Sequence, residues 1–213
     1  MLRRIFDHIL EGDASAATEC VQQALADGTD PAVILNQAMI AAMDETGRRF
    51  EAGDLYVPEM LVAGRAMQSA LGALKPFLVQ ADLEPLGKVV IGTVQGDLHD
   101  IGKNLVALML QGAGFEVIDL GTDVAPARFV QAVREHEPML VAMSALLTTT
   151  MTNMSTTVVA LQAAGLRDRV RVMVGGAPVT RQYADQVGAD MYEPDAASAA
   201  WAARAAAKRE PSV

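Results

Sequence analysis

Two different hydrophobic periods divide this chain of 213 residues. Up to about residue 82, apolar residues recur at helical spacing and no stretch indicates a strand. From Lys88 onward, short apolar runs rich in β-branched residues alternate with helical stretches. The change of period predicts a helical cap over residues 1–82, a linker at 83–87 and an α/β domain over 88–213.

The first 82 residues are predicted to form four helices. Gly12 ends the first helix, and Asp13 and Asp30 are good N-caps for the second and third. A proline follows Asp30 at the first helical position, where it is well tolerated. The expected helices span residues 2–11, 13–28, 30–50 and 57–78. Short connections between them indicate a four-helix bundle.

The rest of the chain alternates strands with helices. Strands are expected at residues 88–94, 115–120, 139–144, 170–175 and 190–192. Helices are expected at residues 101–111, 126–135, 153–163, 181–187 and 196–208. This alternation predicts a parallel sheet covered on both sides. Five strands fit a flavodoxin-like (Rossmann-type) doubly wound fold, class α/β, with strand order 2-1-3-4-5.

Composition narrows the function classes. The formal net charge is −9 and no Lys/Arg cluster stands out, which argues against nucleic-acid binding. The longest apolar run falls short of the roughly 18 residues of a membrane helix, and the chain opens without a signal-peptide pattern. Cys20 is the single cysteine, so a disulfide framework and a cysteine zinc site are excluded. We expect a soluble, cytoplasmic protein that binds neither nucleic acid nor membrane.

Candidate chemistry follows the first expected strand. The loop from Gly96 to Asn104 contains Asp97 and His99, at the sheet edge where open α/β folds bind ligands. A histidine two residues after an aspartate suits a metal ligand whose second ring nitrogen is held by a carboxylate. The alternative is that both side chains only cap the next helix and face water. The loop pattern alone leaves both interpretations open.

Two further loops are expected at the same edge. One is the hydroxyl-rich run from Ser144 to Thr150, and the other contains Gly175 and Gly176. Helix capping and a tight turn are the structural alternatives for these loops. The chain has neither a Gly-x-Gly-x-x-Gly fingerprint after a strand nor a Walker sequence, so dinucleotide and nucleoside-triphosphate sites are poor interpretations.

Taken in chain order, these motifs resemble a known family. The motifs are Tyr56-Val57-Pro58-Glu59, Gly96-Asp97-Leu98-His99-Asp100-Ile101-Gly102-Lys103-Asn104, Ser144-x-Leu146 and Gly175-Gly176. Together they resemble the cobalamin-binding module of cobalamin-dependent methionine synthase. They are still more similar to the small methyl-accepting corrinoid proteins of the methylamine and methanol methyltransferase systems.

The resemblance implies a role for each motif residue. His99 would be the lower axial ligand of cobalt, in place of the dimethylbenzimidazole of the cofactor, so that cobalamin binds base-off and His-on. Asp97 would hold the other imidazole nitrogen, and Thr150 takes the place of a serine that contacts this aspartate in methionine synthase.

The remaining motif residues would contact the cofactor. Its implied contacts in the His99 loop are Gly96, Asp97, Leu98, His99, Asp100, Ile101 and Gly102. Those in the later loops are Ser144, Leu146, Thr148, Gly175 and Gly176, with Gly92 and Ala196 as weaker matches. In the helical cap, Tyr56, Met60 and Met67 are candidates for the upper face, although methionines at such positions are most often core residues.

The implied function is that of a methyl carrier that uses cobalamin as methylcobalamin and as a Co(I) corrinoid. A substrate:corrinoid methyltransferase would load it, a second methyltransferase would pass the methyl group to tetrahydrofolate or a thiol, and a reductive activase would restore it. The chain would then be a carrier subunit rather than a complete enzyme. The alternatives are the cobalamin-binding subunit of an adenosylcobalamin-dependent mutase, which does not normally carry such a cap, and a cobalamin-dependent regulator.

Overall fold

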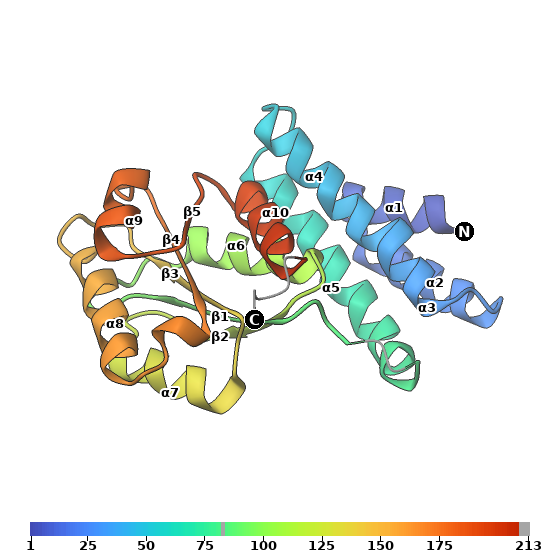
Figure 1. Cartoon of the computed structure of the whole chain (residues 1–213). Helices are drawn as coiled ribbons and strands as arrows, with labels where there is room; N and C mark the ends of the chain where they lie inside the picture. Colours follow the sequence, from blue (N-terminus) through green and yellow to red (C-terminus); the bar gives the residue numbers. More distant parts are fainter. Residues whose placement is uncertain (82–83, 209–213) are drawn as a thin grey trace. The chain divides into compact units, whose positions relative to one another are not determined.

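The computed structural model describes residues 1–81 and 84–208, in two compact units (Figure 1). The first unit contains the described residues of Met1–Pro85 together with Gln111–Gly114. The second contains Leu86–Leu110 and the described residues from Phe115 onward. The expected linker and domain limits include residues 82–83 and 209–213, which lie outside the described part. Within residues 1–81 and 84–208, none of the helices has the length and apolarity needed to cross a membrane.

The first unit is helical, and its four expected helical stretches are confirmed. Its elements are α1 (Leu2–Glu11), α2 (Ala14–Ala26), α3 (Pro31–Ile34), the π-helical segment η1 (Leu35–Ile40), α4 (Ala41–Glu51) and α5 (Val57–Gln80). The expected caps are present, because Asp13 accepts a hydrogen bond from the Ala16 N–H (3.0 Å) and Asp30 accepts one from the Ala32 N–H (2.7 Å). Gly12 ends α1 with a left-handed φ of 80°.

The third helical stretch differs from the regular α-helix that its spacing predicts. α3, η1 and α4 follow one another without a break, and the middle six residues form a π-helix. A π turn inserts an extra residue into the helix and rotates the side chains that follow it. With this insertion, Ile34, Met39 and Met43 are all buried. The insertion could not be predicted from the apolar spacing, because one extra residue in the helix leaves a pattern of three- and four-residue steps almost unchanged.

The second unit is a five-stranded parallel sheet with the order β2-β1-β3-β4-β5, which confirms the expected fold class and strand order. The strands are β1 (Lys88–Thr93), β2 (Glu116–Asp119), β3 (Leu140–Ser144), β4 (Arg171–Gly175) and β5 (Met191–Tyr192). The helices are α6 (Ile101–Gly112, of which Gln111 and Gly112 belong to the first unit), α7 (Pro126–His136), α8 (Thr152–Ala163), the 3-10 turn η2 (Arg167–Arg169), α9 (Arg181–Val187) and α10 (Ala196–Ala207).

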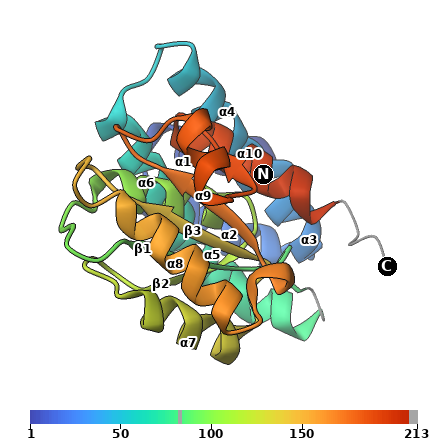
Figure 2. The ribbon, with the colours of Figure 1, turned by 60° about the vertical axis from the view of Figure 1, so that its left-hand side comes forward.

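Both faces of the sheet are covered. α7 and α8 lie on one face, and α6 and α10 lie on the other (Figures 1 and 2). On β1, Val90 belongs to the core cluster that includes Phe129 of α7 and Val158 of α8. Its neighbours Val89 and Ile91, which point to the opposite face, are also buried. Burial on both faces explains why the strand is a nearly continuous apolar run.

Strand order decides which loops meet. Because the strands are parallel, all their carboxyl ends lie at one edge of the sheet. β1 lies between β2 and β3, so the loop after β1 is flanked by the loops after β2 and β3. Thr93, Ser144 and Gly175 form one row across β1, β3 and β4 at this edge. The candidate residues of three separate motifs therefore lie within reach of one another.

Candidate functional site

The loop between β1 and α6 carries the candidate histidine. After Thr93 the chain turns, and the Asp97 N–H donates to the Val94 carbonyl oxygen (3.1 Å). Gly96, the third residue of this turn, has a φ of 82°, a conformation that glycine adopts without steric penalty. The turn brings Asp97 and His99 to the carboxyl end of the sheet.

Asp97 is fully buried and is the centre of the hydrogen-bond network. Its Oδ1 accepts from the backbone N–H of His99 (3.0 Å) and lies 2.7 Å from Nδ1 of the same residue. Its Oδ2 accepts from the Thr150 hydroxyl (2.6 Å) and from the backbone N–H groups of Leu146 (2.8 Å) and Leu147 (3.3 Å). One carboxylate thus joins the loop after β1 to the loop after β3.

The ionisation of Asp97 sets the tautomer of His99. Burial alone would raise the pKa of this carboxyl, but the hydrogen bonds that it accepts, above all from Thr150, outweigh this effect and hold its pKa well below the ordinary range. An ionised carboxylate can only accept hydrogen bonds, so in the neutral imidazole of His99 the proton is on Nδ1. The lone pair of Nε2 is then available to bind a metal.

A second pair of hydroxyls fixes the backbone of the histidine. Thr93, which is fully buried, donates its hydroxyl to the carbonyl oxygen of His99 (2.9 Å), and its Oγ1 lies 3.0 Å from Oγ of Ser144. Because Thr93 uses its only hydroxyl proton on His99, Ser144 is the donor in the contact between the two hydroxyls. Ser144 therefore acts on the histidine loop through Thr93.

Large, exposed aliphatic side chains lie near His99 in the chain or on the segment that donates N–H groups to Asp97. The exposed fractions are 74% for Leu98, 71% for Ile101, 44% for Leu146 and 43% for Leu147, and the His99 side chain is 51% exposed. Leucine and isoleucine exposed in this way near a polar group mark a binding surface. We refer to these four residues as the aliphatic rim. The rim and Nε2 suit a ligand with a broad apolar face and a metal that accepts one nitrogen.

The two glycines after β4 approach the loop after β3. Gly176 has a φ of 126°, and a Cβ atom there would lie 1.9 Å from the carbonyl oxygen of Ala145. Only glycine allows this approach. Gly175 is half-buried at the end of β4. Gly92 instead lies against core side chains, because a Cβ atom there would be 3.0 Å from Cζ of Phe129.

Other candidate residues are placed as follows. Asp100 and Thr148 are exposed in the loops of the site, and Gly102 is exposed in the first turn of α6. Asp100 accepts from the Asn104 side-chain amide (3.0 Å). Ala196 is buried at the first position of α10. In the first unit, Met60 and Met67 are buried and Tyr56 is exposed. Nothing in the second unit's network tests the role of these three cap residues, which stays a prediction.

Several residues of the network were not among the sequence candidates. Asp123, in the loop after β2, accepts from the Gly96 N–H (2.7 Å), and its own N–H donates to the Asp97 carbonyl oxygen (3.0 Å). Lys103 is buried and forms an ion pair with Asp119 at the end of β2. The sequence signal that could have identified Asp119 and Asp123 is the run Asp119-Leu120-Gly121-Thr122-Asp123, which places two carboxylates and a hydroxyl at the end of a short strand.

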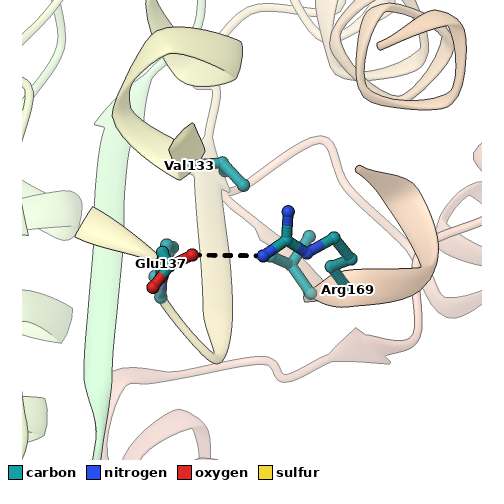
Figure 3. A pocket seen from close by; sticks show the side chains of 5 residues that line it. Val133, Glu137 and Arg169 are labelled. Carbon is teal, nitrogen blue, oxygen red and sulfur yellow. Dashed lines mark hydrogen bonds and ion pairs between the residues drawn. The ribbon is translucent and has the colours of Figure 1, made fainter. Parts of the chain in front are cut away.

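A separate pocket lies at the opposite edge of the sheet (Figure 3). It is lined by Val133, Glu137, Pro138, Arg169 and Val170, which precede β3 and β4 or end α7. The Arg169 guanidinium pairs with Glu137 across it (3.2 Å). It contains none of the candidate residues, and the exposed Glu137–Arg169 pair adds little binding energy.

These features define a class. The chain contains a doubly wound α/β domain whose candidate site, a histidine held by a buried carboxylate, lies where the strand order reverses. Residues 87–202 match the B12 binding domain family, and residues 1–75 match a second family, also described as a B12 binding domain. The chain belongs to the B12-binding corrinoid proteins of the methylamine and methanol methyltransferase systems.

Similar proteins support this membership along nearly the whole chain. Trimethylamine corrinoid protein 1 of Methanosarcina acetivorans is 45% identical over 188 residues, which is 87% of each chain. A cobalamin-binding protein from Desulfitobacterium hafniense matches with a TM-score of 0.80 and 35% identity, covering 96% of this chain and 98% of the other. The methanol:cobalamin methyltransferase complex MtaBC of Methanosarcina barkeri matches with a TM-score of 0.86 and 29% identity, covering 97% and 79%.

The cofactor of the chain is therefore a cobalamin, and its own residues fit this group. Nε2 of His99 would offer a nitrogen ligand for cobalt, and the aliphatic rim would offer an apolar surface for the corrin. The mutase alternative is not favoured, because the N-terminal helices also match a B12 binding domain and the relatives are corrinoid proteins.

Proposed function

We propose that this chain binds cobalamin with His99 as the lower axial ligand of cobalt and carries a methyl group between two methyltransferases. The observation that carries the proposal is the buried Asp97 carboxylate, 2.7 Å from His99 Nδ1. When bound, cobalamin supplies the cobalt that accepts and gives up the methyl group. The chain supplies the nitrogen ligand and its orientation.

The Asp97–His99 pair is suited to a ligand that must bind and release. The carboxylate fixes the ring orientation and the tautomer through the hydrogen bond at Nδ1. Thr150 acts behind it by donating to Oδ2 of Asp97 (2.6 Å). Protonation of Nε2 removes the lone pair that binds cobalt, so proton uptake at this pair favours release of the ligand.

The aliphatic rim is the proposed surface for the lower face of the corrin. Its four side chains come from the β1–α6 connection, including the first residue of α6, and from the loop after β3. Burying them against the macrocycle would contribute about 25 cal/mol for each Å² of apolar surface removed from water. Gly175 and Gly176 are proposed to line the channel for the displaced nucleotide tail, as the family resemblance implies.

The methyl donor that we propose is a methylamine. The support is the likeness to a trimethylamine corrinoid protein at 45% identity, against 29% for the methanol complex. The proposed partners are a substrate:corrinoid methyltransferase, a second methyltransferase that serves tetrahydrofolate or a thiol, and a reductive activase. The MtaBC complex is a methyltransferase complex with a chain similar to this one, which supports the first of these partners.

Histidine ligation can be tested by electron paramagnetic resonance of the Co(II) form. The protein is labelled with nitrogen-15 histidine and reconstituted with unlabelled cobalamin. We expect the nitrogen splitting of the cobalt signal to take the nitrogen-15 pattern, because the ligand is His99 and not the benzimidazole. Retention of the nitrogen-14 pattern would show that the cofactor keeps its own base and that the ligand assignment is wrong.

Two variants complete this experiment. His99→Ala should abolish the labelled splitting. His136→Ala is the matched control, because His136 ends α7 on the second unit but belongs to none of the site loops, and it should leave the splitting unchanged. If His136→Ala also lost the splitting, the loss in His99→Ala would reflect general damage to the protein rather than removal of the cobalt ligand.

Methyl transfer needs its own measurement. Holoprotein is incubated under reducing conditions with an extract of the source cells and with radiolabelled trimethylamine, dimethylamine, monomethylamine or methanol. We expect a methylamine to place light-labile label on the re-isolated protein, and His99→Ala to reduce it. Label from methanol alone would contradict the proposed donor, and the absence of label from all four would contradict the carrier function.

A further inference from the structure

Asp123 has an unusual backbone conformation next to the histidine loop. Its φ is 54°, and among the described residues only Asp123 and Glu137 combine a side chain with a positive φ. Aspartate tolerates the left-handed region better than most residues, but the conformation still carries strain. Strain of this kind persists where the surrounding contacts impose it, and such residues cluster at functional sites.

The left-handed conformation of Asp123 allows two hydrogen bonds to the histidine loop. Its carboxylate Oδ1 accepts from the Gly96 N–H (2.7 Å), and its backbone N–H donates to the Asp97 carbonyl oxygen (3.0 Å). A single residue thus holds two consecutive residues of the histidine loop, one by its side chain and one by its main chain. Two bonds to neighbouring residues resist rotation of the backbone that carries the Asp97 side chain.

We propose that Asp123 is a positioning residue for the Asp97–His99 pair. On the β3 side, Thr150 and Leu146 hold the Asp97 carboxylate. On the β2 side, Asp123 holds the backbone of the same residue. The His99 ring is oriented by Asp97, so its Nε2 points correctly only while both sides are held. The inference rests on the proposed ligation of cobalt by His99.

The loop after β2 does not depend on the Asp123 side chain for its path. The Val124 N–H donates to the Thr93 carbonyl oxygen (2.9 Å), and the Thr93 N–H donates to the Gly121 carbonyl oxygen (2.9 Å). Val94 and Val124 also form a parallel bridge. Variants of Asp123 are therefore expected to fold, and their effect on His99 can be measured.

Three substitutions separate the effect of the Asp123 carboxylate from the effect of its left-handed backbone conformation. Asp123→Asn keeps a side-chain acceptor and a residue type that tolerates positive φ. Asp123→Gly keeps the backbone conformation but removes the acceptor, and Asp123→Ala removes the acceptor and adds strain. Glu137→Ala is the matched control, because it places alanine at the other strained position, at the opposite edge of the sheet.

The primary measurement is the rate at which the Nδ1 proton of His99 exchanges with water in the cofactor-free protein, by nuclear magnetic resonance. Asp123→Gly and Asp123→Ala lose the hydrogen bond from the Gly96 N–H to the charged Asp123 carboxylate. Because the backbone of Asp97 is then held less firmly, the exchange rate of the His99 Nδ1 proton should rise about tenfold. Asp123→Asn and Glu137→Ala should stay near the wild-type rate. In holoprotein, the first two variants should show a Co(II) signal that partly lacks the histidine splitting.

Two outcomes would overturn the inference. One is an unchanged exchange rate in Asp123→Gly and Asp123→Ala. The other is an equal rise in Glu137→Ala, which would trace the effect to general destabilisation. If wild-type holoprotein lacks the histidine splitting, the proposed ligation fails instead, while the exchange rates in the cofactor-free protein still decide whether Asp123 orients the pair.

Discussion

The hydroxyl of Thr150 lies 2.6 Å from Oδ2 of Asp97, although the two residues are 53 positions apart in the chain. Both residues are buried, so the bond forms where water does not compete. The same hydroxyl lies 3.0 Å from the Leu147 carbonyl oxygen, but a hydroxyl has one proton and a carboxylate is the stronger acceptor. Thr150 thereby ties the start of α8 to the histidine loop.

Replacing Thr150 should separate its hydroxyl from its shape. Thr150→Val keeps the shape but removes the donor, and we expect a loss of about 1.5–3 kcal/mol in the free energy of unfolding. Thr150→Ser keeps the donor and loses one methyl group, which is worth about 0.8 kcal/mol. Urea unfolding of the cofactor-free variants measures both values. A serine variant as unstable as the valine variant would mean that packing, not the hydrogen bond, is the main contribution.

The sequence predicted the elements and the main pair of the site for physical reasons. Short apolar runs rich in β-branched residues placed the strands, and apolar residues at helical spacing placed the helices. The parallel strand order brought the loops after β1 and β3 together. Asp97 and His99 are two residues apart, so their contact follows from one tight loop. The contact between Thr150 and Asp97 agrees with the family resemblance, which had placed Thr150 behind the aspartate.

Other parts of the site leave no periodic signal. Asp123 depends on a left-handed φ, and Thr93 depends on a hydroxyl at a position that looks like ordinary buried strand. The π-helical segment at Leu35–Ile40 is a one-residue slip that apolar spacing tolerates. Backbone angles and single hydrogen bonds are decided by tertiary contacts, which a single sequence does not display.

Asp97→Asn should damage the hydrogen-bond network more than a substitution of an exposed residue in the same loop. The amide would turn its NH₂ group towards one set of donors, either His99 or the N–H of Leu146, and leave them unpaired in a buried site. We expect a loss of about 3 kcal/mol or more in the free energy of unfolding. We also expect a mixture of His99 tautomers, because an amide no longer requires the proton on Nδ1. Nitrogen-15 shifts of the ring measure the tautomers.

The control for this variant is Asp100→Asn. Asp100 lies in the same loop and is exposed, and its carboxylate accepts from the exposed side-chain amide of Asn104 (3.0 Å). It should change the free energy of unfolding by less than about 0.5 kcal/mol and leave the tautomer of His99 as it is. An equal effect of the two variants would argue against a special role for the buried carboxylate.

Gly176→Ala should be poorly tolerated. Its Cβ atom would overlap the Ala145 carbonyl oxygen at 1.9 Å, and backbone cannot move aside as a flexible side chain can. Ala145 precedes Leu146, whose N–H binds Asp97, so the displacement would reach the site. Gly165→Ala is the control, since its φ of 69° is also strained but nothing lies within 4 Å. We expect about 1–2 kcal/mol of destabilisation for the control and more for Gly176→Ala, together with weaker cobalamin binding.

Tyr183 supplies a prediction about pH. Its hydroxyl donates to the Met151 carbonyl oxygen (2.6 Å), next to Thr150, and partial burial raises the pKa of Tyr183 above its ordinary value of about 10. A raised pKa in the folded state means that its contribution to stability is complete below about pH 10 and is lost as the pH rises through the folded value. The wild type should therefore lose more stability than Tyr183→Phe between about pH 9 and the alkaline limit of folding.

Chemical unfolding at a series of pH values measures the difference, and tyrosinate absorbance should show that one tyrosine of the wild type ionises late. Parallel losses in the two proteins would mean that the phenol of Tyr183 titrates as it does in the unfolded chain and does not anchor the loop that carries Thr150.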